Sequence, residues 1–316
     1  MLQPPSPHLV ERFARDLAAL VPTGKIGVAV SGGPDSLALL LLANAARPGE
    51  ICAATVDHQL REGSADEAAT VAHLCDGLGI SHAILPVMVA PGASLQAQAR
   101  EARYTALSAW GTARNLTAIA TAHHADDQAE TLLMRLARGA GLSGLAGVRA
   151  SRPLSDTVTL VRPLLDWRKR ELEAIVAQAG LTPADDPANR DPRHDRTRAR
   201  EFLARGDWPD PSKLAISAHH LAEAEDALRF ATDHFADRLA RDGTALTLDA
   251  SGLPRELQRR LLLTAIARLG DSAPRGPDLD RALATLASGG ACTLGTLSLR
   301  SKRDLWHLAP APPRRG

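Results

Sequence analysis

The chain has 316 residues and an almost balanced charge, with 37 lysines and arginines against 36 aspartates and glutamates. This balance excludes binding to polyanions through net charge alone, so only local clusters of basic residues bear on nucleic-acid binding. The length predicts about two domains, and we expect neither a membrane span nor a secretory signal, because the longest apolar run (37–46) is short and the first residues lack a basic segment before an apolar one.

The first two-thirds of the chain alternates between two kinds of pattern. Apolar, β-branched runs predict strands at 26–30, 51–56, 83–89, 117–121 and 157–161. Amphipathic or apolar stretches predict helices at 8–20, 37–43, 64–78, 94–114 and 168–179, and another that begins near residue 123. Ser64 with Glu67 is typical of a capping box, and Asp166 is expected to cap the helix that begins near Arg168. Because strands that alternate with helices pair in parallel, we predict a doubly wound, mainly parallel five-stranded α/β sheet of the Rossmann-like kind.

The pattern changes after the polar turn at 206–211, which we take as the boundary between domains at 1–205 and 206–316. Beyond it, the sequence predicts helices at 212–239, 257–269 and 277–287. A strand is expected at 244–248, and a hairpin is expected from strands at 292–299 and 306–308 around the turn 300–303. This part has no phosphate loop and no closely spaced carboxylate pair, which predicts a smaller helical and β binding domain.

The sequence Ser31-Gly32-Gly33-Pro34-Asp35-Ser36 lies between the first predicted strand and the next helix. Two glycines let backbone N–H groups approach a phosphate, and the helix N-terminus adds unpaired donors and partial positive charge. Ser31 and Ser36 add hydroxyls, and Asp35 is placed to hold a metal ion or to organise the loop. The stretch lacks the Gly-Lys-Ser/Thr ending of a Walker A motif, so no loop lysine reaches the phosphates. The alternative is an ordinary strand–helix turn that needs glycine.

Polar residues also follow two other predicted strands. Asp57 and His58 come after the second strand, and a cluster of histidines and acids at 123–130 follows the fourth. Asp127 and Glu130 are three residues apart, so a helix places both carboxylates on one face. That pair could bind a divalent metal, clamp a cationic substrate, or be a solvated acidic helix start. Because the carboxyl ends of parallel strands share one edge, we expect all these clusters in one crevice.

Two groups of arginines are candidates for phosphate contacts. Arg100 and Arg103 lie one helical turn apart, and we expect Arg103 to meet phosphate or developing negative charge, whereas Arg100 could instead pair with Glu101. Arg196 and Arg198 belong to a polar stretch, 185–200, that is either a charge-balanced surface loop or a contact with nucleotide or nucleic-acid phosphates.

Taken together and in this order, these stretches resemble the tRNA(Ile)-lysidine synthase family, a branch of the PP-loop (N-type) ATP pyrophosphatases. The resemblance rests on the following stretches: 31–36, 56–61, Ala99-Arg100 with Arg103-Tyr104, 121–131, Arg162-Pro163-Leu164-Leu165, and 186–189 with Arg196 and Arg198. Gln59 departs from the pattern, because glycine is common there in the family. The carboxy-terminal part matches weakly, as in the family's shorter members.

The resemblance implies a ligase that forms a C–N bond. ATP adenylates O2 of the wobble cytidine in a tRNA(Ile) with a CAU anticodon, and the ε-amine of free L-lysine then attacks C2 and expels AMP. The product base, lysidine, changes both the codon and the amino-acid identity of the tRNA. The implied partners are this tRNA and lysine, with neither a membrane nor DNA.

The resemblance also implies roles for individual residues. ATP is bound by residues 31–36 with Asp57 and His58, and Mg²⁺ is shared between Asp35 and the phosphates. Lysine is clamped by Asp127 and Glu130. The implied catalytic residues are Asp35, Arg103, Asp127 and Glu130, and the implied phosphate contacts are Arg100, Arg196 and Arg198. Residues 206–316 are expected to hold the tRNA body.

Other functions compete with this interpretation. A tRNA thiolase of the same superfamily usually needs a CxxC pair or a reactive cysteine, but Cys52, Cys75 and Cys292 are scattered. Their spacing also argues against disulfides or a zinc site and indicates the reducing cytoplasm. An ammonia-dependent ligase, such as a NAD synthetase, fits the second domain less well. A non-catalytic nucleotide-sensing or RNA-binding protein would not need the intact acidic residues.

Overall fold

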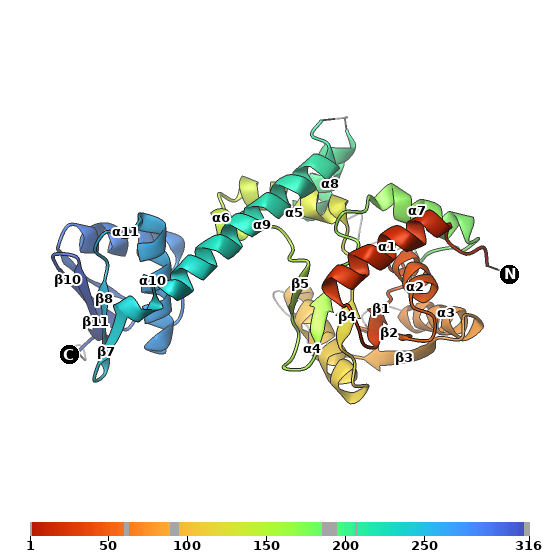
Figure 1. Cartoon of the computed structure of the whole chain (residues 1–316), viewed down its shortest axis with the longest axis horizontal. Coiled ribbons are helices and arrows are strands. Elements are labelled where there is room, and N and C mark those ends of the chain that lie inside the picture. Colours follow the sequence, from red (N-terminus) through yellow and green to blue (C-terminus); the bar gives the residue numbers. More distant parts are fainter. Residues whose placement is uncertain (1, 60–62, 89–94, 185–194, 206–207, 313–316) are drawn as a thin grey trace. The chain divides into compact units, whose positions relative to one another are not determined.

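The computed structural model describes residues 2–59, 63–88, 95–184, 195–205 and 208–312. The chain forms two compact units, Met1–Ala222 and Glu223–Gly316 (Figure 1). Helix α9, Pro211–His234, contributes residues to both units, so this division falls inside a helix. Within the described ranges, no helix has the length and apolar character needed to cross a membrane.

Unit 1 is built on a six-stranded sheet with the strand order β3-β2-β1-β4-β6-β5. The strands are β1 (Ile26–Ala29), β2 (Ile51–Asp57), β3 (Ser81–Pro86), β4 (Ala118–Ala120), β5 (Ser151–Pro153) and β6 (Thr159–Val161). All neighbours pair in parallel except β5, which is antiparallel to β6. The predicted mainly parallel α/β fold is confirmed, with one correction: the sheet has a sixth strand. The sequence gives no signal for β5, because a three-residue edge strand with two exposed residues has no apolar run.

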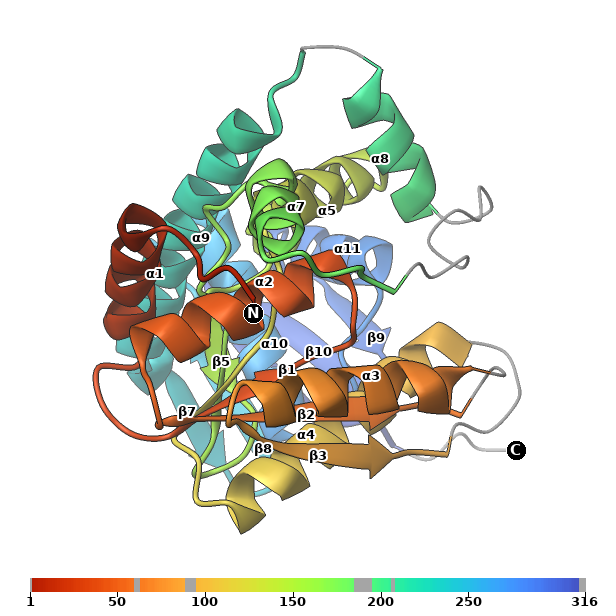
Figure 2. The same ribbon diagram turned by 90° about the vertical axis from the view of Figure 1, so that its right-hand side faces the viewer.

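Helices cover both faces of this sheet (Figure 2). Unit 1 contains α1 (Pro7–Leu20), α2 (Pro34–Ala46), α3 (Ser64–Gly77), α4 (Leu95–Ala113), α5 (Ala125–Ala137), α6 (Leu142–Leu145), α7 (Lys169–Gln178) and α8 (Asp195–Ala204). One core lies between the sheet and α2 and α3, with α1 and α7 packed against α2, and a second core lies under α4. Successive strand residues alternate between the two cores, as Ile119 and Ala120 do.

Gly27 in β1 allows α4 to pack closely on the sheet. A Cβ at this position would lie 2.5 Å from the ring of Trp110, closer than any real carbon contact. The glycine is therefore required by the tryptophan that covers it.

Two predicted helix caps are wrong. Helix α3 begins at Ser64 itself, because Gly63 adopts φ +92° and takes the cap position, so the serine cannot cap the helix. Helix α7 is preceded by Arg168 rather than capped by Asp166, and the Arg168 N–H donates to the Glu171 carboxylate at 2.8 Å.

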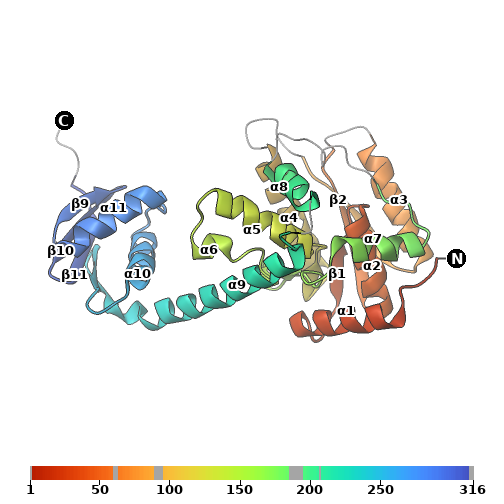
Figure 3. The ribbon, with the colours of Figure 1, turned by 90° about the horizontal axis from the view of Figure 1, so that it is seen from above.

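Unit 2 packs two helices, α10 (Arg255–Arg268) and α11 (Gly276–Ala287), on a five-stranded antiparallel sheet ordered β7-β8-β11-β10-β9 (Figure 3). The strands are β7 (Leu239–Asp242), β8 (Ala245–Asp249), β9 (Ala291–Leu294), β10 (Leu297–Lys302) and β11 (Leu305–Pro310). The buried Trp306 anchors the core.

The sequence patterns misplaced three boundaries in this unit. The helix expected to reach 239 ends at His234. The strand expected over 292–299 is two strands, because Gly295 turns the chain at φ +60°. The next hairpin turns at Arg303, which has φ +59°, rather than across 300–303.

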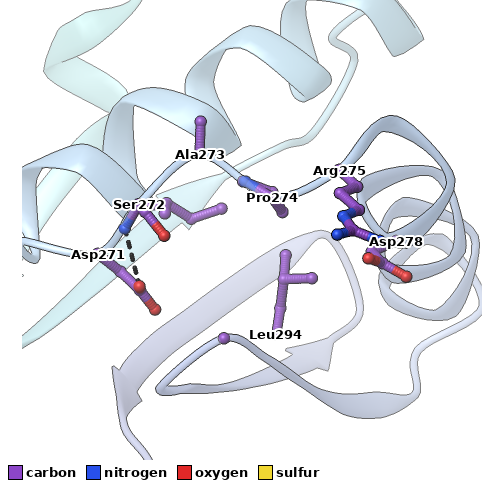
Figure 4. Close-up of a pocket in the computed structure, with 9 residues that line it drawn as sticks. Asp271, Ser272, Ala273, Pro274, Arg275, Asp278 and Leu294 are labelled. Atoms are coloured by element: carbon purple, nitrogen blue, oxygen red, sulfur yellow. Dashed lines mark hydrogen bonds between the residues drawn. The ribbon is translucent and has the colours of Figure 1, made fainter. Parts of the chain in front are cut away.

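Unit 2 also contains a cavity of about 360 Å³ between the start of α11 and the turn at Gly295 (Figure 4). Its principal acid, Asp271, accepts hydrogen bonds from Ser272 N, Thr296 N and Thr296 Oγ1. The carboxylate is therefore used to hold two loops together, and we assign the cavity no role in the chemistry.

Candidate active site

The loop after β1 holds its shape through its own serines. Ser31 N–H donates to Ser36 Oγ at 3.1 Å, and Ser36 Oγ donates to Gly33 O at 2.9 Å. Gly32 has φ +86°, a conformation that L side chains rarely adopt. Pro34 occupies the first turn of α2, and no side chain caps the helix. Among the described residues, the first backbone N–H groups of α2 therefore have no capping side chain, as a phosphate site requires.

His124 connects this loop to the acidic cluster. It is the N-cap of α5: its Nδ1 accepts the Asp127 N–H at 3.3 Å, and its own N–H donates to Asp127 Oδ2 at 3.0 Å. Its Nε2 lies 3.4 Å from Asp35 Oδ2 and 3.6 Å from Asp127 Oδ2. Aspartates from α2 and α5 thus meet on one buried ring. This role could not be predicted from the local pattern, because histidine is not a favoured N-cap.

The charge around His124 opposes the effect of its burial. Burial lowers the pKa of the imidazole. The hydrogen bond to Asp35 and the charges of Asp127, Asp35 and Asp126 raise the pKa by more than burial lowers it, so the net pKa lies above its ordinary value. Since Nδ1 accepts a hydrogen bond, the proton of the neutral ring lies on Nε2, toward Asp35.

Asp35 has one oxygen free for a further ligand. Oδ2 faces His124, whereas Oδ1 is buried and has no hydrogen-bond partner among the described residues. A buried carboxylate oxygen without a donor is costly unless a cation or donor joins it. Mg²⁺ is commonly held by one or two carboxylates together with substrate phosphates, so a single free oxygen beside a phosphate loop fits this ion.

The acidic pair of α5 is paired with arginines from α8. Glu130 is 3% exposed; its Oε2 accepts Arg196 Nε at 2.6 Å and its Oε1 accepts Arg200 Nε at 2.9 Å. Arg196 also donates to Asp127. Arg196 therefore bridges the two carboxylates that the sequence placed in one site. Arg200 was not predicted, although its spacing of four residues from Arg196 indicates a shared helix face.

Arg198 lies apart from this pair. Its guanidinium lies 3.9 Å from Asp195, and its side chain is mostly exposed. The structure thus brings Arg196, but not Arg198, to the carboxylates of α5.

Basic residues gather on the other side of the site. Burial is the main cause that lowers the pKa of both His58 and His123, and the charge of Arg103 lowers both pKa values further. Burial with the charges of four arginines lowers the pKa of His123 to about 2, so this ring is neutral at any working pH.

Asp57 ends β2, and its Oδ1 accepts the Gln59 N–H at 3.0 Å. Gln59 has φ +52°, which explains a preference for glycine at this position.

A second network, also not predicted, holds the start of α5 in place. Arg168 donates to Asp126 at 3.1 Å and to Asp210 at 3.1 Å, and Lys169 N–H donates to Asp126 at 2.8 Å. The network ties the starts of α5, α7 and α9 together within unit 1.

Comparisons with known proteins agree with this geometry. A family model described as a PP-loop domain matches residues 6–206. A tRNA(Ile)-lysidine synthase of Novosphingobium aromaticivorans is 48% identical over 307 residues, which cover 96% of this chain and 94% of that protein. The chain belongs to the tRNA(Ile)-lysidine synthase family. Another member, from Zymomonas mobilis subsp. mobilis, is 40% identical and covers 93% of this chain and 90% of its own length. The predicted family is therefore confirmed.

A solved structure outside the family shares the fold. The U34-tRNA thiolase NcsA from Methanococcus maripaludis, solved with its [4Fe-4S] cluster, has a TM-score of 0.56 at 18% identity, over 68% of this chain and 79% of its own. The likeness concerns the fold alone.

The cysteines of this chain do not form a reactive group. Cys52, Cys75 and Cys292 are free, and burial raises the pKa of each thiol, for Cys75 to about 11. Among the residues that the structure describes, no three metal-ligating side chains cluster together. Thiolates that must bind a metal or attack sulfur need a lowered pKa, so these observations oppose the thiolase alternative.

Proposed function

We propose that this protein is a cytoplasmic ATP-dependent ligase that joins free L-lysine to C2 of the wobble cytidine in CAU-anticodon tRNA(Ile), through an O2-adenylated intermediate, and releases AMP and pyrophosphate. The observation that carries this proposal is the meeting of Asp35 and Asp127 on the His124 ring. This contact joins a phosphate loop to an acidic pair, and family membership supports the reaction.

ATP binding is assigned to the carboxyl edge of the sheet. The loop 31–36 would hold the β and γ phosphates, and Asp57 and His58 would lie near the adenosine, because β2 is the neighbour of β1. Asp35 would hold Mg²⁺ through its free Oδ1. When bound, the ion supplies positive charge that offsets the charge of the phosphates.

Lysine binding is assigned to Asp127 and Glu130. Both carboxylates already hold a cation, the guanidinium of Arg196. An incoming ammonium group could replace that guanidinium without changing the net charge of the site. The exchange leaves Glu130 on Arg200, so the buried carboxylate is never without a partner.

The same exchange distinguishes the two carboxylates as proton acceptors. At pH 7 about one lysine amine in a few thousand is neutral, which corresponds to a deficit of roughly 4–5 kcal/mol. A carboxylate that accepts the proton offsets much of this deficit. Glu130 keeps Arg200 on its other oxygen, whereas Asp127 has no arginine left once Arg196 moves. We therefore assign the general base to Asp127 and the clamp to Glu130.

Arg103 is assigned to the charge that develops on the transferring adenylate. After burial, the charge of Arg103 is among the causes that lower the pKa of His58 and His123, which follow β2 and β4, and this supports a position near both strand ends. A fixed guanidinium at that position would stabilise negative charge in the transition state.

Unit 2 is assigned to the tRNA body. Arg300, Lys302 and Arg303 lie on exposed parts of β10 and its turn, and no carboxylate of the described residues forms an ion pair with them. By contrast, Arg281 on α11 pairs with Asp278. The triple change R300Q/K302Q/R303Q should weaken tRNA binding and leave ATP binding intact, whereas R281Q should change neither. Unchanged tRNA affinity in the triple variant would contradict the assignment.

The proposed reaction is tested with labelled lysine, ATP and unmodified CAU-anticodon tRNA(Ile). Lysine incorporation coupled to AMP, rather than ADP, is expected, and its rate should fall by about 100-fold in D127N and E130Q. The exposed Asp76 provides a matched control, D76N, that should retain activity. Incorporation of ammonia or sulfur in place of lysine, or ATP binding without turnover, would each refute the proposal in favour of a named alternative.

A further inference from the structure

A group of arginines surrounds Tyr104 at the carboxyl edge of the sheet. The guanidinium carbons of Arg100 and Arg103 each lie 5.1 Å from the centre of the tyrosine ring, and that of Arg152 lies 4.6 Å from it. The charge of the buried Arg162 also acts on the Tyr104 hydroxyl and, with those of Arg100 and Arg103, lowers its pKa against the effect of burial. We call these four arginines the Tyr104 cluster.

The fold, not the local sequence, assembles the Tyr104 cluster. Arg100 and Tyr104 are four residues apart on α4, so they share a helix face. Arg152 pairs with Leu160 across the β5–β6 ladder, and directly paired residues point to the same side of a sheet. Leu160 belongs to the core under α4, so Arg152 points toward Tyr104. Arg162, two residues beyond Leu160, points to that side as well.

These guanidinium groups have no negative partner among the residues that the structure describes. No carboxylate of the described residues forms an ion pair with any of the four, whereas many other arginines of the chain are paired. Arg162 donates to the backbone carbonyl oxygen of Arg149, and Arg152 donates to that of Pro153 at 3.2 Å, so both bond to neutral acceptors. Gathering like charges without counterions costs free energy, which a bound anion would recover. Burial lowers the pKa of His123, and the charges of Arg162, Arg103 and Arg100, three members of the cluster, lower it further.

We propose that Arg100 and Arg152 of the Tyr104 cluster bind phosphodiester groups of the substrate RNA next to the target nucleotide, with Arg152 as the contact farther from the phosphate loop. The buried Arg162 adds positive charge behind them, and Arg103 keeps its role at the adenylate. The inference rests on the proposed function, which supplies an RNA substrate. Guanidinium groups bind phosphate through two parallel hydrogen bonds.

Position favours RNA over ATP as the source of the phosphate. The strand order places β5 three strands from β1, which carries the phosphate loop. With about 4.8 Å between neighbouring strands, this separation is about 14 Å. ATP phosphates held at residues 31–36 would lie far from Arg152, whereas an RNA strand has a phosphate at every nucleotide and can follow the edge of the sheet.

The test compares full-length R152Q with R114Q as the matched control. Arg114 follows the other end of α4 and is exposed, so R114Q removes the same charge away from the cluster. Binding of unmodified CAU-anticodon tRNA is measured by fluorescence anisotropy at several salt concentrations, and binding of ATP alone by calorimetry. R152Q should weaken tRNA binding about tenfold and reduce the slope of log K against log salt by about 0.7–0.9. R152K should recover part of the loss, and R114Q should resemble the unchanged protein.

The outcomes separate the sources of the phosphate. If R152Q binds tRNA with unchanged affinity and salt slope, the inference is wrong. If R152Q instead loses affinity for ATP alone, the cluster serves a nucleotide phosphate and the RNA assignment is overturned. Failure of the proposed function has a different signature: the unchanged protein would not incorporate lysine, yet R152Q would still weaken its binding to RNA. A melting curve of R152Q, expected to match that of R114Q, checks that both variants are folded.

Discussion

Replacing Glu130 by glutamine isolates the charge at the centre of the acidic pair. The carboxylate is buried, and each of its oxygens accepts one arginine N–H, from Arg196 at 2.6 Å and from Arg200 at 2.9 Å. Glutamine has nearly the same shape but only one acceptor oxygen. Its amide NH₂ would therefore face one of the two guanidinium groups, donor against donor.

The structure sets the size of the effect. A hydrogen bond to a charged group contributes about 1.5–3 kcal/mol, so losing one and weakening the other has an upper bound of roughly 4 kcal/mol. The side chains of Arg196 and Arg200 are 45% and 39% exposed and can recover water, which lowers the expected loss. We expect about 2 kcal/mol, or a fall of roughly 4–8 °C in the melting temperature of unit 1.

The assay combines calorimetry with lysine kinetics. E130Q should also reduce kcat/KM for lysine by about 100-fold, because a buried carboxylate no longer faces the ammonium group. D76N is the control for both measurements. A double-mutant cycle with R200Q should show coupling, since the two side chains are in direct contact. A melting temperature within about 1 °C of the unchanged protein, together with additive effects in the cycle, would show that Glu130 does not stabilise unit 1 through these two arginines.

Three further changes test other parts of the structure. Gly27→Ala should destabilise unit 1 by about 1–3 kcal/mol in calorimetry, because its Cβ would meet the Trp110 ring, whereas Gly77→Ala, with open space around it, should not. His124→Asn keeps a good N-cap but removes a group whose pKa is raised on folding, so the stability advantage of histidine should be fully present below its ordinary pKa of 6.5 and should be lost as the pH rises through the raised value. Denaturant titrations between about pH 5.5 and 9 test this, and a pH-independent difference would contradict it. Trp306→Ala, in the core of unit 2, should cost about 3–5 kcal/mol there and weaken tRNA binding, while ATP binding by calorimetry stays unchanged.

The position of the candidate site along the chain follows from local sequence patterns. Two glycines between an apolar, β-branched run and an apolar helix located the loop at 31–36, because these are properties of the local sequence. Alternation of strands and helices then implied a parallel sheet, and a parallel sheet brings the ends of its strands to one edge. From these rules alone, Asp35 and Asp127 were expected to lie close together, and the structure places them on the same histidine ring.

The side chains that complete the site come together through packing of distant segments. Arg196 and Arg200 reach Glu130 from 66 and 70 residues away, and Arg152 reaches Tyr104 from an edge strand without an apolar pattern. The role of His124 likewise depends on a neighbour from another helix. Local patterns predict how each segment folds. An ion pair such as Arg196–Glu130, or the Tyr104 cluster, depends instead on where distant segments pack. That placement follows from burial of the whole core, which no short stretch of sequence contains.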